Sequence, residues 1–590
     1  MRVGRFKILL LLALITIAAY PQHAAAVSYE FELGLLAVSS DEGIVVPASI
    51  TLRPGRGEVS LEPADLLHPS LRVSTEVAFH IAALTAGVNP YSYSLSVRFG
   101  TDRELGGPSA SAFIASSLLL VMRWGLLPRR DVSMTGMVSL TGLVVPVAGV
   151  ELKAKAAGKA GFREILVPLG EEELANSSLR GSDSKAVGVC SILEAASLLG
   201  GLNGVPLPTV LSNVSLPREV LNVFARDARR FYAAIRNLSS YVEEGFVEAH
   251  INPIVSAFDD ALKEDPYSAA SLAFAAGYVL AANVTSTRGF SFVEEVFGVS
   301  YDEALSRARA VLANVSAELE REGACSLPSL SALAAAEVRL YLAEQARNAT
   351  APGTKVLGLM RALSAETWAK AAAAAADEPP YVPCALVADV ARYLAEYAER
   401  GYEYLRSIQE TSEVEIRMPD ERDVRLWLED ALRYAREGNY IRSIGVSLYV
   451  ISVLETAFAF APGMDRGCVE RHLLMLAASS MLYRKTLPTL LVWRYAKKYA
   501  GILDEAGLGR NTGWALLVDA ASWMLLPLSL AALSEQPAYE KVSTVYKLAP
   551  SMGVAIILAE AAAVALVGYA SMRASIAPSA SSSNTESEAN

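Results

Sequence analysis

The sequence is poor in the residues that bind metal ions. Its 590 residues contain only five histidines and four cysteines, and the cysteines are widely spaced at Cys190, Cys325, Cys384 and Cys468. No CxxC or HExxH motif occurs. Structural zinc and iron–sulfur sites use closely spaced thiolate or imidazole ligands. We therefore expect no metal site and no cofactor.

Two further shortages exclude other classes of protein. No GxxxxGK[ST] motif is present, so the sequence shows no P-loop ATPase module. Basic residues number 52 against 63 acidic residues, a net charge of -11. Nucleic-acid binding depends on neutralising phosphates, so we expect no nucleic-acid partner. The chain is 52% hydrophobic and 19% charged. This composition and the length suit a globular protein of roughly two to four domains.

The N-terminus has the pattern of an export signal. Arg2, Arg5 and Lys7 precede an apolar run, residues 8–20, and small residues follow at positions 24–26. This order predicts a signal peptide over residues 1–26, cleaved before Val27. The alternative is an uncleaved membrane anchor. Under either interpretation the body of the chain is exported.

Two features agree with export. N-x-[ST] sequons, which make the chain a candidate glycoprotein, begin at Asn176, Asn213, Asn237, Asn283, Asn314 and Asn348. The four cysteines outside the cytosol form two disulfides, in one of three pairings, or stay as buried free thiols.

The C-terminal region contains a candidate membrane anchor. Residues 548–572 are largely apolar with Glu560 as their one charge, and such a helix spans about 30 Å of hydrocarbon. Glu560 would cost roughly 2.5–3.5 kcal/mol there. We predict a transmembrane helix over 548–572, with packing inside protein as the alternative, and a disordered tail over 574–590. The predicted location is the cell membrane, with most of the chain extracytoplasmic.

A second apolar stretch, residues 513–533, is interrupted by Asp519 and Pro527. We expect a buried helix there rather than a second membrane span.

Between these ends the residue pattern of the chain changes once. Residues 27–206 alternate strand and helix patterns, among them a helix from Pro108 to Trp124, and this indicates an α+β domain. Residues 217–537 carry apolar positions at helical spacing, as at Val220 and Phe224, separated by proline and glycine. This pattern predicts an all-helical domain of roughly a dozen helices.

A serine and a lysine in the first domain suggest chemistry. A serine hydroxyl needs a positioned base to become nucleophilic, and a buried lysine that has lost its proton can serve. Ser109 follows Gly-Gly-Pro at the start of a predicted apolar helix. Lys153 lies in an alanine-rich helix with Val150, Ala154 and Ala157 on its apolar face. Taken alone, such residues are more often a helix cap and a solvent-exposed lysine.

The ordered set of motifs resembles the proteolytic domain of the Lon-type serine proteases. The matching segments are Gly106 to Ser111, Asp131 to Gly136, Pro146 to Lys153, Ala156 to Gly161 and Ile165 to Pro168. The likeness covers roughly Ser28 to Gly201. It implies an α+β Lon-type proteolytic fold, followed here by the large all-α domain and the C-terminal transmembrane helix.

The resemblance also implies residue roles. Ser109 matches the nucleophile, Lys153 the general base, and Thr135 a threonine that orients the lysine; Lys155, two residues on, points elsewhere. The chain departs from the family at Gly106, where an acidic residue is common, and this departure removes a possible partner of the lysine. Met137 and Ala148 also depart, but the dyad is retained.

The sequence therefore predicts a membrane-anchored serine endopeptidase that acts without ATP on unfolded or flexible polypeptides. The family often forms hexameric rings, but assembly of this chain into a homo-oligomer stays open. Three alternatives remain. The fold is a non-catalytic scaffold, the dyad cuts only its own chain, or the function is that of an envelope protein whose helices at 217–537 bind a partner.

Overall fold

The computed structural model describes residues 28–39, 41–202, 214–321, 323–411, 416–418, 420–479 and 486–534. The predicted signal peptide, the predicted anchor at 548–572, the tail at 574–590 and Asn213 lie outside these residues. All described residues belong to one compact unit that ends at Pro537. Within it, an α/β region up to residue 202 is followed by a largely helical region from residue 214.

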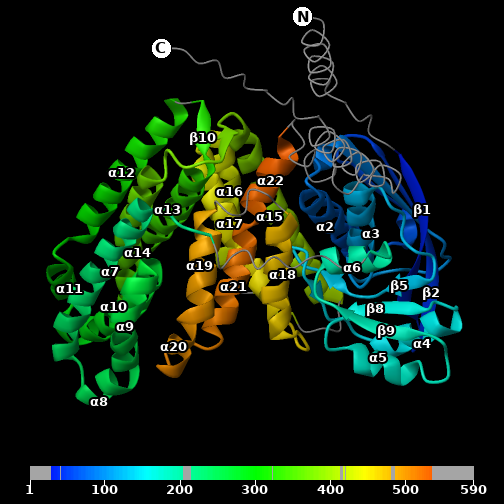
Figure 1. The fold of residues 1–590 in the computed structure, drawn as a ribbon, viewed down its shortest axis with the longest axis horizontal. Coiled ribbons are helices and arrows are strands. Elements are labelled where there is room, and N and C mark those ends of the chain that lie inside the picture. Colours follow the sequence, from blue (N-terminus) through cyan, green and yellow to red (C-terminus); the bar gives the residue numbers. More distant parts are fainter. Residues whose placement is uncertain are drawn as a thin grey trace, which may run out of the picture. The chain divides into compact units, whose positions relative to one another are not determined.

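The first sheet of the α/β region has four strands in the order β1-β2-β4-β3 (Figure 1). β1 and β2 form a long antiparallel hairpin, with Tyr29 opposite Leu52 and Ser39 opposite Glu42. β2 and β4 are antiparallel, whereas β3 and β4 are parallel. The strands are β1 (Tyr29–Ser39), β2 (Glu42–Pro54), β3 (Val59–Glu62) and β4 (Tyr93–Phe99).

A second, parallel sheet has the order β5-β8-β9, and β6 and β7 form a short antiparallel pair. Ile165, Leu166 and Val167 in the central strand are fully buried, as a continuous apolar run in a parallel sheet predicts. The strands are β5 (Val132–Met134), β6 (Met137–Val138), β7 (Val144–Val145), β8 (Glu164–Pro168) and β9 (Lys185–Val189).

Five α-helices complete this region. α3 packs against α2 and α6, and α4 packs against β2. α2 and α3 carry buried residues on almost every side, so they form the centre of the core. The helices are α2 (Pro69–Ala86), α3 (Ser111–Trp124), α4 (Val150–Lys159), α5 (Glu172–Ser178) and α6 (Ile192–Leu199).

The prediction that a helix begins at Pro108 is wrong by three residues. α3 begins at Ser111, whose N–H donates to the carbonyl of Pro108 at 2.9 Å in a turn. Gly107 has φ +85°, a left-handed conformation that suits glycine and redirects the chain ahead of the helix. Ser109 therefore lies in this turn and not in the helix.

The second region is largely helical, as predicted, but its described residues also contain a short β-ribbon, so it is not all-α. β10 (Ala324–Ser326) pairs with β11 (Tyr381–Pro383) in antiparallel fashion. The helices are α7 (Arg218–Leu238), α8 (Glu244–Phe246), α9 (Asn252–Glu264), α10 (Pro266–Arg288), α11 (Phe290–Phe297), α12 (Tyr301–Arg321), α13 (Leu327–Ala346), α14 (Pro352–Ala374), α15 (Leu386–Thr411), α16 (Glu421–Glu437), α17 (Tyr440–Ala459), α18 (Arg466–Ser479), α19 (Leu487–Lys498), α20 (Ala500–Glu505), α21 (Thr512–Trp523) and α22 (Leu525–Leu533).

All four cysteines form disulfides, which resolves the alternatives left by the sequence. Cys325 pairs with Cys384 beside the β10–β11 ribbon. Cys190 pairs with Cys468, 278 residues away. This second bond links the end of β9 covalently to α18, and therefore joins the α/β region to the helical region.

Among the residues that the structure describes, three helical segments are long and apolar enough to cross a membrane by length and composition: residues 266–288, 440–459 and 512–533. The last contains α21 and α22, and 83% of its most apolar window is buried inside the fold. This burial agrees with the expectation of a buried helix at 513–533. The predicted anchor at 548–572 stays a prediction.

Candidate active site

Ser109 lies half-buried in the turn before α3. Its backbone carbonyl accepts hydrogen bonds from the N–H of Gly136 at 2.9 Å and from the hydroxyl of Thr135 at 3.4 Å. The N–H of Ala112 donates back to the carbonyl of Gly136 at 3.2 Å. The structure thus brings together two of the segments that the motif analysis selected.

Thr135 is fully buried between β5 and β6. Its N–H donates to the carbonyl of Leu166 at 3.0 Å, which ties it to the central strand of the parallel sheet. The hydrogen bond of its hydroxyl goes to the backbone of Ser109. Thr135 therefore holds the turn of the predicted nucleophile, whereas its predicted effect on Lys153 stays a prediction.

Lys153 is buried, with 5% of its surface exposed. It lies in the first turns of α4, which begins after Gly149 in the left-handed conformation, with φ 68°. Val150, Ala154 and Ala157 are also buried, as the predicted apolar face requires. The Nζ atom donates a hydrogen bond to the carbonyl of Ala148 at 2.8 Å. Lys155 is exposed, which agrees with its exclusion from the dyad.

Two backbone N–H groups beside Ser109 remain open. In the first turn of α3, the N–H of Ser111 is used by Pro108 and that of Ala112 by Gly136. Within the described part of the chain, the N–H groups of Ser109 and Ala110 donate to no other group. Open amides beside a nucleophile are the donors that an oxyanion requires.

Sequence reasoning missed an acidic group on the lysine side of this region. Glu171 follows β8 and stands at the N-cap position of α5, where its side chain makes no capping hydrogen bond. Its Oε2 atom is buried. Burial raises the pKa of Glu171 to about 7, although Lys153 counteracts that rise. The one signal in the sequence was the acidic run at 171–173 directly after the strand.

Helix α15 of the helical region reaches the same part of the α/β region through tyrosines at helical spacing. Tyr404 places its hydroxyl 3.3 Å from Oγ of Ser111, two residues after Ser109. Tyr397 donates to the carbonyl of Leu140 at 2.7 Å. Tyr393 lies 3.1 Å from Nδ1 of His80, which is buried in α2. Nothing in the amphipathic pattern of α15 distinguished these residues from ordinary core.

A second buried polar contact surrounds His472 of α18. Its Nε2 lies 2.9 Å from Oγ1 of Thr141, and its Nδ1 lies 3.0 Å from Oγ of Ser191. The Thr141 hydroxyl donates to Glu455 at 2.7 Å, so it accepts from Nε2–H, and Nδ1 accepts from Ser191. Burial lowers the pKa of His472 to about 3. The ring is therefore neutral.

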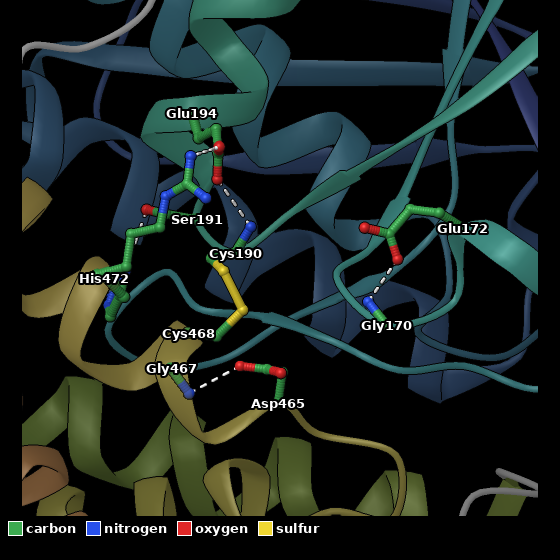
Figure 2. Close-up of a disulfide and its surroundings, with 10 residues drawn as sticks. Gly170, Glu172, Cys190, Ser191, Glu194, Asp465, Gly467, Cys468 and His472 are labelled. Carbon is green, nitrogen blue, oxygen red and sulfur yellow. Dashed lines mark hydrogen bonds and ion pairs between the residues drawn. A yellow bond between two sulfur atoms is a disulfide. The ribbon is translucent and has the colours of Figure 1, made fainter.

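Figure 2 shows this contact beside the Cys190–Cys468 disulfide. Glu194 of α6 accepts a hydrogen bond from the N–H of Cys190 at 2.9 Å and pairs with Arg471 of α18. The disulfide, the ion pair and the histidine contact use residues 190, 191 and 194 on one side and residues 468, 471 and 472 on the other. They bind the two regions together but offer no solvent-exposed nucleophile, because Ser191 and His472 are buried.

Among the residues that the structure describes, no group of three or more histidine, cysteine, aspartate or glutamate side chains is placed to hold a metal ion.

The comparison with known protein families bears directly on this site. Residues 103–177 match the model of the Lon protease (S16) C-terminal proteolytic domain. The matched range contains Ser109, Thr135, Lys153 and Glu171. The predicted resemblance to the Lon-type proteolytic domain is therefore confirmed for this part of the chain.

Individual relatives are also Lon proteases. The chain is 33% identical to the Lon protease of Methylocella silvestris over 134 residues, 21% of this chain and 16% of the relative. It is 28% identical to the archaeal Lon protease of Pyrococcus abyssi over 146 residues, 24% of this chain and 14% of the relative. It is 42% identical to the human peroxisomal Lon protease homolog 2 over 110 residues, 16% of this chain and 13% of the relative. The chain thus covers less than a fifth of each of these proteins.

Proposed function

We propose that this protein is a serine endopeptidase that uses Ser109 and Lys153 as a catalytic dyad. The observation that carries the proposal is the burial of Lys153 in a region that matches the Lon proteolytic domain. Burial among apolar side chains disfavours an ammonium ion, and a general base must be able to exist without its proton. Ser109 supports the proposal because its half-buried turn is fixed by two hydrogen bonds to the 135–136 loop.

In the proposed reaction, Oγ of Ser109 attacks the carbonyl carbon of the scissile peptide bond. Nζ of Lys153 takes the hydroxyl proton and passes it to the leaving amine, so the first product departs and an acyl-enzyme remains. A water molecule then attacks the ester, again with Lys153 as base, and releases the second product. The N–H groups of Ser109 and Ala110 are the proposed donors to the oxyanion.

The proposed setting is the outside of the cell membrane. The apparent signal sequence at 1–26 and the apolar segment at 548–572 support it. Two disulfides also suit an oxidising compartment. The printed sequence has no P-loop motif, so we propose that the enzyme cleaves polypeptides that are already unfolded, without ATP. Whether it acts as a homo-oligomer is part of the same test.

The test is cleavage of a reduced and carboxymethylated substrate protein by the full chain, in detergent and without ATP. We expect Ser109→Ala and Lys153→Ala each to lower kcat/KM by about 10³-fold or more, because the two groups act as one unit. Lys155→Ala is the matched control, since it removes an exposed lysine from the same helix. Size-exclusion chromatography of the active sample reports the oligomeric state. Comparable cleavage by the Ser109→Ala protein would refute the proposal.

The same experiment separates the alternatives. A size change of the chain during expression that disappears in Ser109→Ala, without cleavage of the added substrate, indicates self-processing only. The absence of both activities in the folded wild-type protein indicates a non-catalytic scaffold.

A further inference from the structure

The turn that carries Ser109 is attached to the rest of the α/β region on both sides of the serine. After it, the 135–136 loop donates two hydrogen bonds to the carbonyl of Ser109. Before it, the N–H of Gly107 donates to Oγ of Ser70 at 3.0 Å. Ser70 is fully buried in the first turn of α2. A side chain of a core helix therefore holds the backbone two residues ahead of the proposed nucleophile.

The hydroxyl of Ser70 is oriented in turn by His68, the half-buried residue at the N-cap of α2. Nδ1 of His68 accepts the N–H of Ser70 at 3.2 Å and lies 3.0 Å from Oγ of Ser70. Because Nδ1 accepts a hydrogen bond from the N–H, it carries no proton, and the Ser70 hydroxyl donates to it. A lone pair of Oγ is then directed at Gly107. The hydrogen bonds thus run in one direction, from Gly107 through Ser70 to His68.

The backbone holds His68 against the segment that leads into the turn. The N–H of His68 donates to the carbonyl of Leu105 at 2.8 Å, and the N–H of Leu105 donates to the carbonyl of Leu66 at 2.8 Å. A Cβ atom on Gly106 would lie 3.1 Å from Cβ of His68, which is tighter than an ordinary contact. The lack of a side chain at Gly106, where the Lon family often has an acidic residue, therefore leaves room for His68.

We propose that His68 is a positioning residue that acts through Ser70 to hold the Ser109 turn in its reactive conformation. This inference rests on the proposed dyad. Gly107 is left-handed, with φ +85°, and the bond to its N–H fixes the peptide unit that redirects the chain toward Ser109. Without an acceptor at Nδ1, the Ser70 hydroxyl rotates and no longer directs a lone pair at Gly107. Because a misplacement of about 1 Å costs up to 10²-fold in rate, this pair outside the site influences kcat.

The first test is the separate effect on kcat and KM for the unfolded substrate. We expect His68→Ala to lower kcat by about 10-fold or more and to leave KM within about twofold, because contacts with the bound substrate are retained. His68→Asn should restore kcat to within about threefold of the wild type, since asparagine is a good N-cap whose Oδ1 replaces Nδ1. The chain itself uses this arrangement at Asn89, whose Oδ1 accepts the N–H of Tyr91 at 2.9 Å.

Two control variants separate the position of the turn from the stability of the fold. Asn89→Ala removes the corresponding cap from the short helix at 90–92. Ser74→Ala removes a buried hydroxyl of α2 that donates to the carbonyl of Leu71 at 3.0 Å. Both should leave kcat unchanged. A folded His68→Ala protein with the kcat of the wild type, or a His68→Asn protein as impaired as His68→Ala, overturns the proposal.

A second measurement does not depend on proteolysis. In the full-length Ser109→Ala protein, hydrogen–deuterium exchange of the peptide over residues 105–111, read by mass spectrometry, reports the N–H of Gly107. We expect an added Ser70→Ala substitution to give this peptide a further rapidly exchanging N–H, and an added Ser74→Ala substitution to change nothing. Unchanged exchange with Ser70→Ala overturns the proposal even where His68→Ala does not fold. If exchange behaves as expected but the wild type cleaves nothing, the dyad proposal fails while the attachment of the turn to α2 stands.

Discussion

The α/β region and the helical region differ in what determines their structure. In the α/β region, short turns carry the important residues, and the left-handed Gly107 and Gly149 lie next to the Ser109 turn and at the start of the Lys153 helix. In the helical region, long helices such as α14 and α15 are fixed by apolar packing. The proposed site therefore depends on a few backbone positions in one region, whereas the other region is built by helix packing. The contact between them is polar, buried and covalently closed, which indicates that the helical region completes the core of the α/β region.

The two disulfides give the largest expected effect on stability, because one joins the regions and the other lies within the helical region. Removing a native disulfide typically costs 2–5 kcal/mol. The Cys190–Cys468 bond spans 278 residues and the Cys325–Cys384 bond 59. In the loop-entropy description the longer loop, with the shorter one nested inside it, contributes about 1 kcal/mol more. We expect Cys190→Ser/Cys468→Ser to destabilise the protein more than Cys325→Ser/Cys384→Ser.

Urea unfolding followed by circular dichroism measures both variants against the wild type. Equal losses of unfolding free energy, or a larger loss for the variant without Cys325–Cys384, would show that the bond between the regions does not contribute more to stability.

The next largest expected effect is a loss of folding stability in acid, caused by His472 at the contact between the regions. The pKa of this histidine is lowered to about 3 in the folded protein from an ordinary 6.5. The unfolded chain then binds the proton first, so stability is lost as pH falls below 6.5. From pH 7 to pH 5 this single group costs about 2 kcal/mol. His472→Gln should remove that part of the pH dependence.

The quantity to compare is the change in unfolding free energy between pH 7 and pH 5 for wild type and variant. Buried carboxyl groups such as Asp227 and Glu337, whose pKa values burial raises to about 6, act in the opposite direction. They contribute equally in both proteins, so the difference isolates His472. His250→Gln is the control, since that histidine is only half-buried in the helical region. An identical pH dependence in wild type and His472→Gln would contradict the expected effect.

The smallest effect concerns a single hydroxyl group. Tyr404→Phe removes the contact with Ser111 next to the nucleophile turn, and a buried hydrogen bond contributes about 0.5–1.5 kcal/mol. Tyr402→Phe on the same helix removes a hydroxyl that donates to Glu421 at the surface, and we expect it to change stability by less. Thermal unfolding of the two variants makes the comparison, and a larger loss for Tyr402→Phe would reverse it.

The sequence predicted the α/β region well because its helices and strands follow from patterns of neighbouring residues. The mixed strand and helix patterns of residues 27–206 predicted an α+β domain, and the motif at 165–168 lies in the buried strand β8. The start of α3 was placed too early, because the pattern of a proline at a helix start also fits a turn that precedes the helix. The spacing of Val150, Ala154 and Ala157 was compatible with a buried Lys153, but it was the resemblance to the Lon-type proteolytic domain that favoured this residue over an ordinary solvent-exposed lysine.

The parts that could not be predicted are those that depend on distant segments. An acidic run after a strand ordinarily faces solvent, so the burial of the Oε2 atom of Glu171 emerges only from the fold. The pairing of Cys190 with Cys468 depends on the position of α18 against α6. The tyrosines of α15 share their spacing with any buried helix face, so the partner of each hydroxyl emerges only from the fold.

The link between Cys190 and Cys468 has a consequence for the order in which the protein matures. During synthesis Cys190 emerges long before its covalent partner Cys468, which is 278 residues further along the chain. The bond can close only after residue 468 has been made, and disulfides form in oxidising compartments. The covalent link between the two regions is therefore a late step in the maturation of the chain.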